Sequence, residues 1–204
     1  MKDWIGNSNS IYKTLGASNH TDQERENNDY YATDPIAIDK LLSVETPNKN
    51  IWECACGEGH LAKRLYDKGY AVFCSDIVNR GYEEVVYDFL EAKKEDGFYP
   101  ENYDILTNPP YKYAKEFVLK ALEILPQNCK CYMFLKLTFL EGKTRYKELF
   151  SKYPPKTIYV FSERCLCAKN GEFDYMREHG GSAVAYAWFV WQKGYNGDTV
   201  VKWI

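Results

Sequence analysis

Segments with the composition of β-strands alternate with helical segments from about residue 51 to residue 191, and this alternation strongly constrains the fold. The clearest helical segment, residues 114–125, has apolar side chains at i, i+3, i+4, i+7, i+8 and i+11 and ends before Pro126. Because parallel strands need crossover helices, the pattern predicts an α/β fold with a mostly parallel sheet and helices on both faces. Two late strand-like runs, residues 157–161 and 182–191, are joined without an obvious helix and predict an antiparallel edge strand.

A glycine-rich turn follows the first strand-like run. Its sequence is Glu53-Cys-Ala-Cys-Gly57-Glu-Gly59, and a helical run begins directly after it. Glycine lets the backbone approach a ligand closely, and the first turn of a helix presents free N–H groups. A carboxylate at this place suits an ammonium group or an ordered water, and the turn lacks the third glycine of the dinucleotide-binding pattern. The candidate cofactor-binding residues here are Glu53, Cys54, Ala55, Gly57 and Gly59.

Acidic residues also end the next two strand-like runs. Asp76 stands roughly 20 residues past the glycine-rich turn, where a carboxylate can accept hydrogen bonds from ribose hydroxyls. A turn or helix cap is the alternative role for that side chain. Asp88 ends a third, short strand-like run. Asp76 with its neighbour Ile77, and Asp88 with its neighbour Phe89, are therefore candidate cofactor-binding residues.

A stiff turn follows the fourth strand-like run, at Asn108-Pro-Pro-Tyr111. Consecutive prolines can neither continue a β-ladder nor enter a helix directly, so the backbone here is restricted. The turn offers one side-chain amide, carbonyl oxygens and an aromatic ring at the carboxyl end of a strand, where open α/β sheets place their chemistry. These groups suit a planar amino compound, and an ordinary proline-rich turn is the alternative.

With these two motifs in this order, residues 30–191 resemble the amino-methyltransferases that carry Asn-Pro-Pro-Tyr, chiefly the adenine-specific DNA methyltransferases. The resemblance implies a Rossmann-like, seven-stranded methyltransferase fold and S-adenosylmethionine as cofactor. It implies that the segment containing Tyr31, Thr33 and Pro35 helps to hold the methionine end of the cofactor, and that Asp88 and Phe89 receive its adenine. The motif order is similar to the gamma arrangement of these enzymes.

The same resemblance implies a mechanism. The Asn108 side-chain carbonyl and the Pro109 backbone carbonyl would accept both hydrogens of the adenine 6-amino group, which turns its lone pair toward the sulfonium methyl for direct in-line transfer. Pro110 keeps the turn rigid, and Tyr111 would stack on a base flipped out of the duplex. Asn108 is also expected beside the cofactor. Lys112, Tyr113, Lys136 and Arg164 are candidates for phosphate contacts.

Several alternatives stay open. The motif also occurs in enzymes that methylate an RNA base amino group or a protein glutamine, and the amino group of cytosine in DNA is a further target. A non-catalytic subunit with this fold is the alternative from another class.

The organisation expected is a polar, flexible amino-terminal segment, residues 1–29, followed by one catalytic domain, residues 30–204, without a separate target-recognition domain. In this respect the chain resembles the compact methyltransferases of bacteriophages and prophages. Sequence recognition would then rest on short loops, a recognition subunit or a homodimer. Protection from restriction, phage defence and regulation are all open as biological roles.

The net charge of −3, from 26 basic and 29 acidic side chains, requires that any DNA-binding surface be local, and residues 141–156 carry the densest basic run. No apolar run is long enough to span a bilayer, and the amino terminus lacks the pattern of a signal peptide. The expected location is the cytoplasm of a bacterial host, without membrane partners. The seven cysteines, six of them in Cys-x-Cys pairs, should be reduced there and are interpreted as buried structural residues, with a metal site as the alternative.

Overall fold

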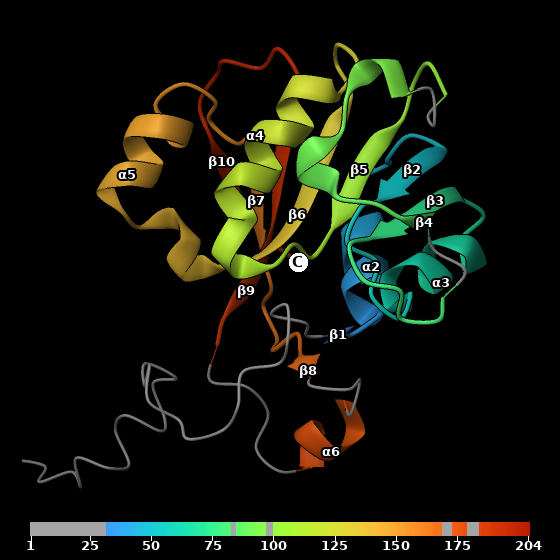
Figure 1. Cartoon of the computed structure of the whole chain (residues 1–204). Helices are drawn as coiled ribbons and strands as arrows, with labels where there is room; N and C mark the ends of the chain where they lie inside the picture. Colours follow the sequence, from blue (N-terminus) through green and yellow to red (C-terminus); the bar gives the residue numbers. More distant parts are fainter. Residues whose placement is uncertain (1–31, 83–84, 97–99, 169–172, 179–183) are drawn as a thin grey trace, which may run out of the picture.

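A mixed eight-stranded sheet forms the centre of the computed structural model, which describes residues 32–82, 85–96, 100–168, 173–178 and 184–204 (Figure 1). The strand order is β10-β7-β9-β6-β5-β2-β3-β4. The strands are β2 (Asn50–Glu53), β3 (Ala71–Asp76), β4 (Val85–Val86), β5 (Asp104–Thr107), β6 (Lys130–Lys136), β7 (Thr157–Val160), β9 (Tyr186–Gln192) and β10 (Val200–Trp203). The expected polar segment 1–29 and Tyr31 lie outside the described residues.

The prediction of a mostly parallel sheet with an antiparallel strand toward one side is confirmed, with two differences in detail. Strand β9 runs antiparallel to both of its neighbours, β6 and β7, so it lies inside the sheet and not at its outermost edge. Strand β10 adds an eighth strand, parallel to β7. The resemblance implied seven strands, and the short carboxyl-terminal run of apolar residues adds the eighth to the same sheet.

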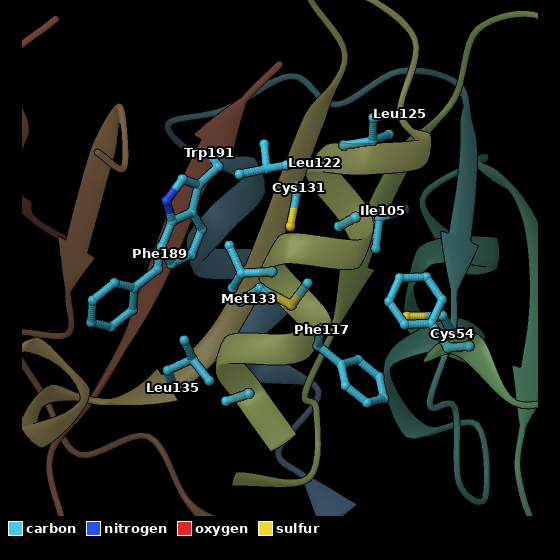
Figure 2. Packing of buried hydrophobic residues seen from close by; sticks show 14 of the residues in the cluster. Cys54, Ile105, Phe117, Leu122, Leu125, Cys131, Met133, Leu135, Phe189 and Trp191 are labelled. Atoms are coloured by element: carbon cyan, nitrogen blue, oxygen red, sulfur yellow. The ribbon is translucent and has the colours of Figure 1, made fainter. Parts of the chain in front are cut away.

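Helices cover both faces of the sheet. On one face lie α2 (Ile36–Leu42) and α3 (His60–Asp67), whose buried side chains pack with Ile51, Leu106 and Tyr132. On the other face lies α4 (Ala114–Ile124), where Phe117, Leu122 and Leu125 pack with Ile105, Cys131, Met133 and Trp191 (Figure 2). Ile105 and Leu106 are adjacent in β5 and belong to opposite faces, as the two-residue period of a strand requires.

Shorter elements connect these layers. They are η2 (Phe89–Glu91), η3 (Lys94–Asp96), η4 (Tyr111–Tyr113), η5 (Leu137–Leu140), α5 (Lys143–Arg145), the π-helix η6 (Tyr146–Phe150) and α6 (Phe173–Glu178). The long apolar run 130–140 is divided between two elements, because β6 ends at Lys136 and η5 follows. The helical residues 143–150 are divided between α5 and η6.

A second, two-stranded sheet joins distant parts of the chain. Strand β1 (Ala32–Thr33) pairs antiparallel with β8 (Cys167–Ala168), and Thr33 is the Cα partner of Cys167. Figure 1 shows this pair beside the carboxyl ends of the central strands. The polar connection 162–181 contains strand β8 and helix α6 among its described residues.

All seven cysteines are buried free thiols. Cys131 and Cys167 lie in strands, whereas Cys54 directly follows β2, where the chain turns. No helix within the described residues has the length and apolar character needed to cross a membrane.

Candidate active site

A cavity of about 610 Å³ lies at the carboxyl ends of β2, β3 and β5. Its walls bring together most of the residues that the sequence identified in separate motifs. These are Thr33, Glu53, Cys54, Ala55, Asp76, Ile77, Asp88, Phe89, Asn108, Pro109, Pro110 and Tyr111. Pro35, Gly57 and Gly59 are not among the lining residues.

The glycine-rich turn is held by Asp76. The Gly57 N–H donates to Asp76 Oδ2 at 2.9 Å, and the Val78 N–H donates to Asp76 Oδ1 at 3.0 Å. Asp76 therefore acts as a cap of the turn. Its carboxylate has further lone pairs, which are the ones that would accept hydrogen bonds from ribose hydroxyls. Gly57 and Gly59 both have positive φ angles, 56° and 76°, which side-chain-bearing residues rarely adopt. The two glycines thus contribute backbone shape, while Cys54, Ala55 and Cys56 form the wall.

Glu53 is buried at the end of β2, with 1% of its surface exposed. Burial raises the pKa of its carboxyl to about 8, and the nearby negative charge of Asp76 adds to the rise. The Thr107 hydroxyl and the Ala55 N–H oppose the rise, but within the described part of the chain neither carboxyl oxygen makes a hydrogen bond of ordinary geometry. A buried acid in this condition is well suited to a cationic or hydrogen-bond-donating ligand.

Aromatic side chains form another wall. Phe89 packs edge-on against Trp52, with ring centroids 5.0 Å apart, and its ring centroid is 4.9 Å from that of Phe117. Asp88 Oδ1 accepts from the Leu90 N–H at 2.9 Å and so begins η2. The expected strand end at Asp88 is therefore the start of a 3₁₀ turn, two residues after β4.

The Asn-Pro-Pro-Tyr turn follows β5 directly. The Tyr113 N–H donates to the Pro110 carbonyl at 2.9 Å, which closes the turn into η4. Asn108 Nδ2 donates to Thr33 Oγ1 at 2.8 Å and to Cys167 Sγ at 3.5 Å. The Tyr111 hydroxyl lies 3.5 Å from the same sulfur.

Lys136 contacts the tyrosine of this turn. Its Nζ lies 4.5 Å from the centroid of the Tyr111 ring, whose centroid is in turn 6.2 Å from that of Tyr186. The Lys136 side chain therefore lies next to the Asn-Pro-Pro-Tyr turn. Burial raises the pKa of the Tyr111 hydroxyl well above its ordinary value, so this ring remains neutral.

The segment before α2 reaches the cavity at Thr33. The Thr33 hydroxyl is directed at Asn108, and Asp34 Oδ1 accepts from the Ile36 N–H at 3.1 Å, as expected of a helix-capping acid. Pro35 is half-buried at the beginning of α2 and lies away from the cavity walls.

Sequence reasoning missed several cavity residues. They are Ala32, Cys56, His60, Leu61, Arg80, Tyr87, Leu90 and Phe117. Phe117 was recognised only as a core position of α4, because helical periodicity does not distinguish a wall from a core. Cys167 is not a lining residue, and as a member of a Cys-x-Cys pair it was interpreted only as a buried structural thiol, without its contact to Asn108.

The basic run 141–156 is only partly available to a polyanion. Lys143, Lys147 and Lys152 are exposed. Arg145 is engaged with the Thr138 carbonyl, and Lys156 donates to Gln192 Oε1 at 2.7 Å. Lys112 and Tyr113 are also exposed and line the cavity mouth.

Comparison with protein-family models gives no match, and comparison with curated proteins gives none. Solved structures do match. A candidate class I S-adenosylmethionine-dependent methyltransferase from Listeria monocytogenes is 12% identical with a TM-score of 0.58, over 96% of this chain and 71% of that chain. A candidate RNA methyltransferase from Pyrococcus horikoshii is 14% identical with a TM-score of 0.55, over 92% of this chain and 99% of that chain.

A third match is a modification subunit of a candidate type I restriction enzyme from Vibrio vulnificus. It is 14% identical with a TM-score of 0.56, and the match covers 96% of this chain but only 49% of that chain. At these identities the likeness concerns the fold. The chain has the fold of the class I S-adenosylmethionine-dependent methyltransferases.

Proposed function

We propose that the protein transfers a methyl group from S-adenosylmethionine to the 6-amino group of adenine in DNA. The observation that carries the proposal is the position of the Asn108-Pro-Pro-Tyr111 turn on the wall of the same cavity that the glycine-rich turn shapes. A methyl donor held by one motif would therefore lie next to an amino group held by the other.

The cavity fits the proposed cofactor by volume and by the chemistry of its walls. About 610 Å³ is within the range of roughly 300–1,000 Å³ typical of small-molecule sites. The buried Glu53 carboxyl suits the ammonium group of the methionine moiety, and Asp76 lies where ribose hydroxyls would be expected. Phe89 and Phe117 offer apolar ring surface to adenine, beside Asp88. When bound, the cofactor would supply an electrophilic methyl group.

The residues of the turn would orient the acceptor. The Asn108 side-chain carbonyl and the Pro109 carbonyl are hydrogen-bond acceptors that can take both amino hydrogens of the base, so that the nitrogen lone pair points to the methyl group. The ring of Tyr111 supplies a stacking surface, which is typically worth about 1–3 kcal/mol for each base. A duplex base cannot reach this cavity without being flipped out of the helix.

DNA is favoured as substrate by the motif, and by the Vibrio neighbour, which is a modification subunit of a candidate restriction enzyme. Lys112 and Tyr113 at the cavity mouth are placed to contact a phosphate and a base next to the target. Because the Vibrio neighbour is a modification subunit, a partner subunit is a candidate source of sequence recognition. An RNA base is the second candidate, because the Pyrococcus neighbour is a candidate RNA methyltransferase and the same carbonyl pair would hold any planar amino group.

The test is transfer of labelled methyl from S-adenosylmethionine to unmethylated DNA, RNA and bulk protein in parallel. The proposal expects label in DNA, lost in Asn108→Ala and retained in the matched control Asn196→Ala, whose side chain is exposed between β9 and β10. Label in RNA or protein alone would keep the reaction and overturn the substrate. Absence of cofactor binding by calorimetry would overturn the methyltransferase proposal itself.

A further inference from the structure

The orientation of the Asn108 side-chain amide matters to the proposed reaction. The two ends of an amide have the same shape but opposite hydrogen-bonding character. Only one orientation turns the carbonyl oxygen to the acceptor amino group, and the flipped amide would present an N–H group to another N–H group. A device that fixes the amide would therefore contribute directly to transfer.

Two strands outside the main sheet hold the NH₂ end of this amide. Asn108 Nδ2 donates to Thr33 Oγ1 at 2.8 Å and to Cys167 Sγ at 3.5 Å. Thr33 lies in β1 and Cys167 in β8, and the two residues are Cα partners in the antiparallel pair. Both are buried, at 3% and 7% exposure. The pair of strands thus presents two acceptors to the same NH₂ group.

Several donors surround the Cys167 sulfur, and they bear on which groups donate and which accept around the Asn108 amide. Burial raises the pKa of the Cys167 thiol, and donors from Tyr111, Asn108, Thr33 and Tyr186 oppose that rise. A Thr33 hydroxyl whose proton faces the sulfur turns its lone pairs toward Asn108 Nδ2. A flipped amide would keep these two contacts only if the Thr33 hydroxyl and the Cys167 thiol both turned their protons to Oδ1, whereas in the observed orientation the NH₂ group supplies the protons.

We propose that Thr33 and Cys167, joined by the β1–β8 pair, are positioning residues that orient the Asn108 amide for methyl transfer. This inference rests on the proposed function and changes one role within it: the Thr33 hydroxyl serves the acceptor side of the reaction and not the cofactor. Under this proposal, strand β8 serves to bring Cys167 next to Asn108.

The test separates transfer from cofactor binding. In single-turnover transfer to unmethylated double-stranded DNA, Thr33→Val should lower the rate about tenfold, the effect of losing one well-placed hydrogen bond, while the Kd for S-adenosylmethionine stays within about twofold. Thr33→Ser should restore the rate. Cys167→Ala should lower it severalfold and Cys167→Ser should restore it. Thr157→Val and Cys129→Ala, which alter a buried threonine and a buried cysteine elsewhere, are the matched controls and should leave the rate unchanged.

A second measurement is independent of transfer. The side-chain NH₂ resonances of Asn108, assigned by their loss in Asn108→Ala, should shift and exchange faster with solvent in Thr33→Val, and should recover in Thr33→Ser. Unchanged resonances and an unchanged rate would overturn the positioning role. A raised Kd for S-adenosylmethionine in Thr33→Val with an unchanged transfer rate would assign Thr33 to cofactor binding instead. If RNA or protein proves to be the acceptor, the same transfer rates are measured on that substrate. If no acceptor is methylated, the proposed function fails, and the Asn108 resonances alone then test whether Thr33 orients the amide.

Discussion

At the scale of single residues, Glu53 combines near-complete burial with a cavity position. Its pKa of about 8 means that the carboxyl is mostly protonated at pH 7 in the free protein. An ammonium group placed beside it favours the ionised form, so binding of such a ligand should release protons. The sequence located this carboxylate correctly at the end of the strand, but its protonation state depends on neighbours that only the fold brings together.

Cofactor binding should therefore be linked to proton release through Glu53. At pH 7, the calorimetric enthalpy of S-adenosylmethionine binding should vary with the ionisation enthalpy of the buffer in the sense of proton release, and Glu53→Gln should remove most of that dependence. Affinity of the wild type should rise from pH 6 toward pH 8. A buffer dependence that is the same in Glu53→Gln would assign the released proton to another group.

The same residue should lower stability of the free protein at alkaline pH. Because the folded pKa of Glu53 lies above its ordinary value of 4.5, the folded state binds more protons than the unfolded state between about pH 4.5 and pH 8. Stability from this group is thus complete below pH 4.5 and is lost as the pH rises to 8, on the order of a few kcal/mol. Urea unfolding at pH 8 should show Glu53→Gln to be more stable than the wild type, whereas an equal or lower stability would contradict the burial of an unsatisfied acid.

At the scale of elements, the strand ends carried the most information in the sequence. Asp76, Asp88 and Asn108 each follow a short apolar run, and the fold gathers them because carboxyl ends of parallel strands share one edge. The pairing of β1 with β8 could not be found in this way. Its strands are two residues each, and their contact joins positions 33 and 167 without a local pattern.

The glycine-rich turn yields a prediction about backbone shape. An added Cβ at Gly59 would lie 2.4 Å from atoms of the Tyr82 ring, whereas one at Gly69, with a similar φ of +80°, would meet nothing within 4 Å. Gly69→Ala should therefore lower the free energy of unfolding only by the cost of placing alanine in the left-handed backbone conformation, about 1–2 kcal/mol. Gly59→Ala should lose more in urea unfolding and should also weaken cofactor binding. Equal losses in both variants, with unchanged binding, would show that the tight contact at Gly59 has no role.

At the scale of the whole molecule, a polar cluster ties the sheet to the connection between α2 and β2. Glu45 accepts from Tyr159 at 2.7 Å and from Tyr132 at 3.3 Å, and it is ion-paired with Lys130. Burial alone would raise the pKa of Glu45, but the hydrogen bonds and charge of Lys130 and the tyrosines lower it below its ordinary value. No sequence pattern indicates this cluster, since its members come from β6, β7 and a loop far apart in the chain.

This cluster should stabilise the protein at neutral pH. Because the folded pKa of Glu45 is lowered, its contribution is present above the unfolded value of 4.5 and is lost as the pH falls through the folded value. Glu45→Gln should lower the free energy of unfolding at pH 7 by about 1–3 kcal/mol and should reduce the loss on acidification. Asp39→Asn, in a half-exposed ion pair with Arg64, is the control and should lose less than about 1 kcal/mol. Equal effects of the two substitutions would contradict a special role for Glu45.

The fold places the Asn108-Pro-Pro-Tyr111 turn on the wall of the cavity proposed for the cofactor, and the central claim is that the two act together on adenine in DNA. The most direct test is mass spectrometry of nucleosides from DNA of cells that lack adenine methylation of their own and express the protein. The account predicts 6-methyladenine with the wild type and none with Asn108→Ala at equal protein level. Methylation found only on cytosine, or adenine methylation that persists in Asn108→Ala, would contradict it.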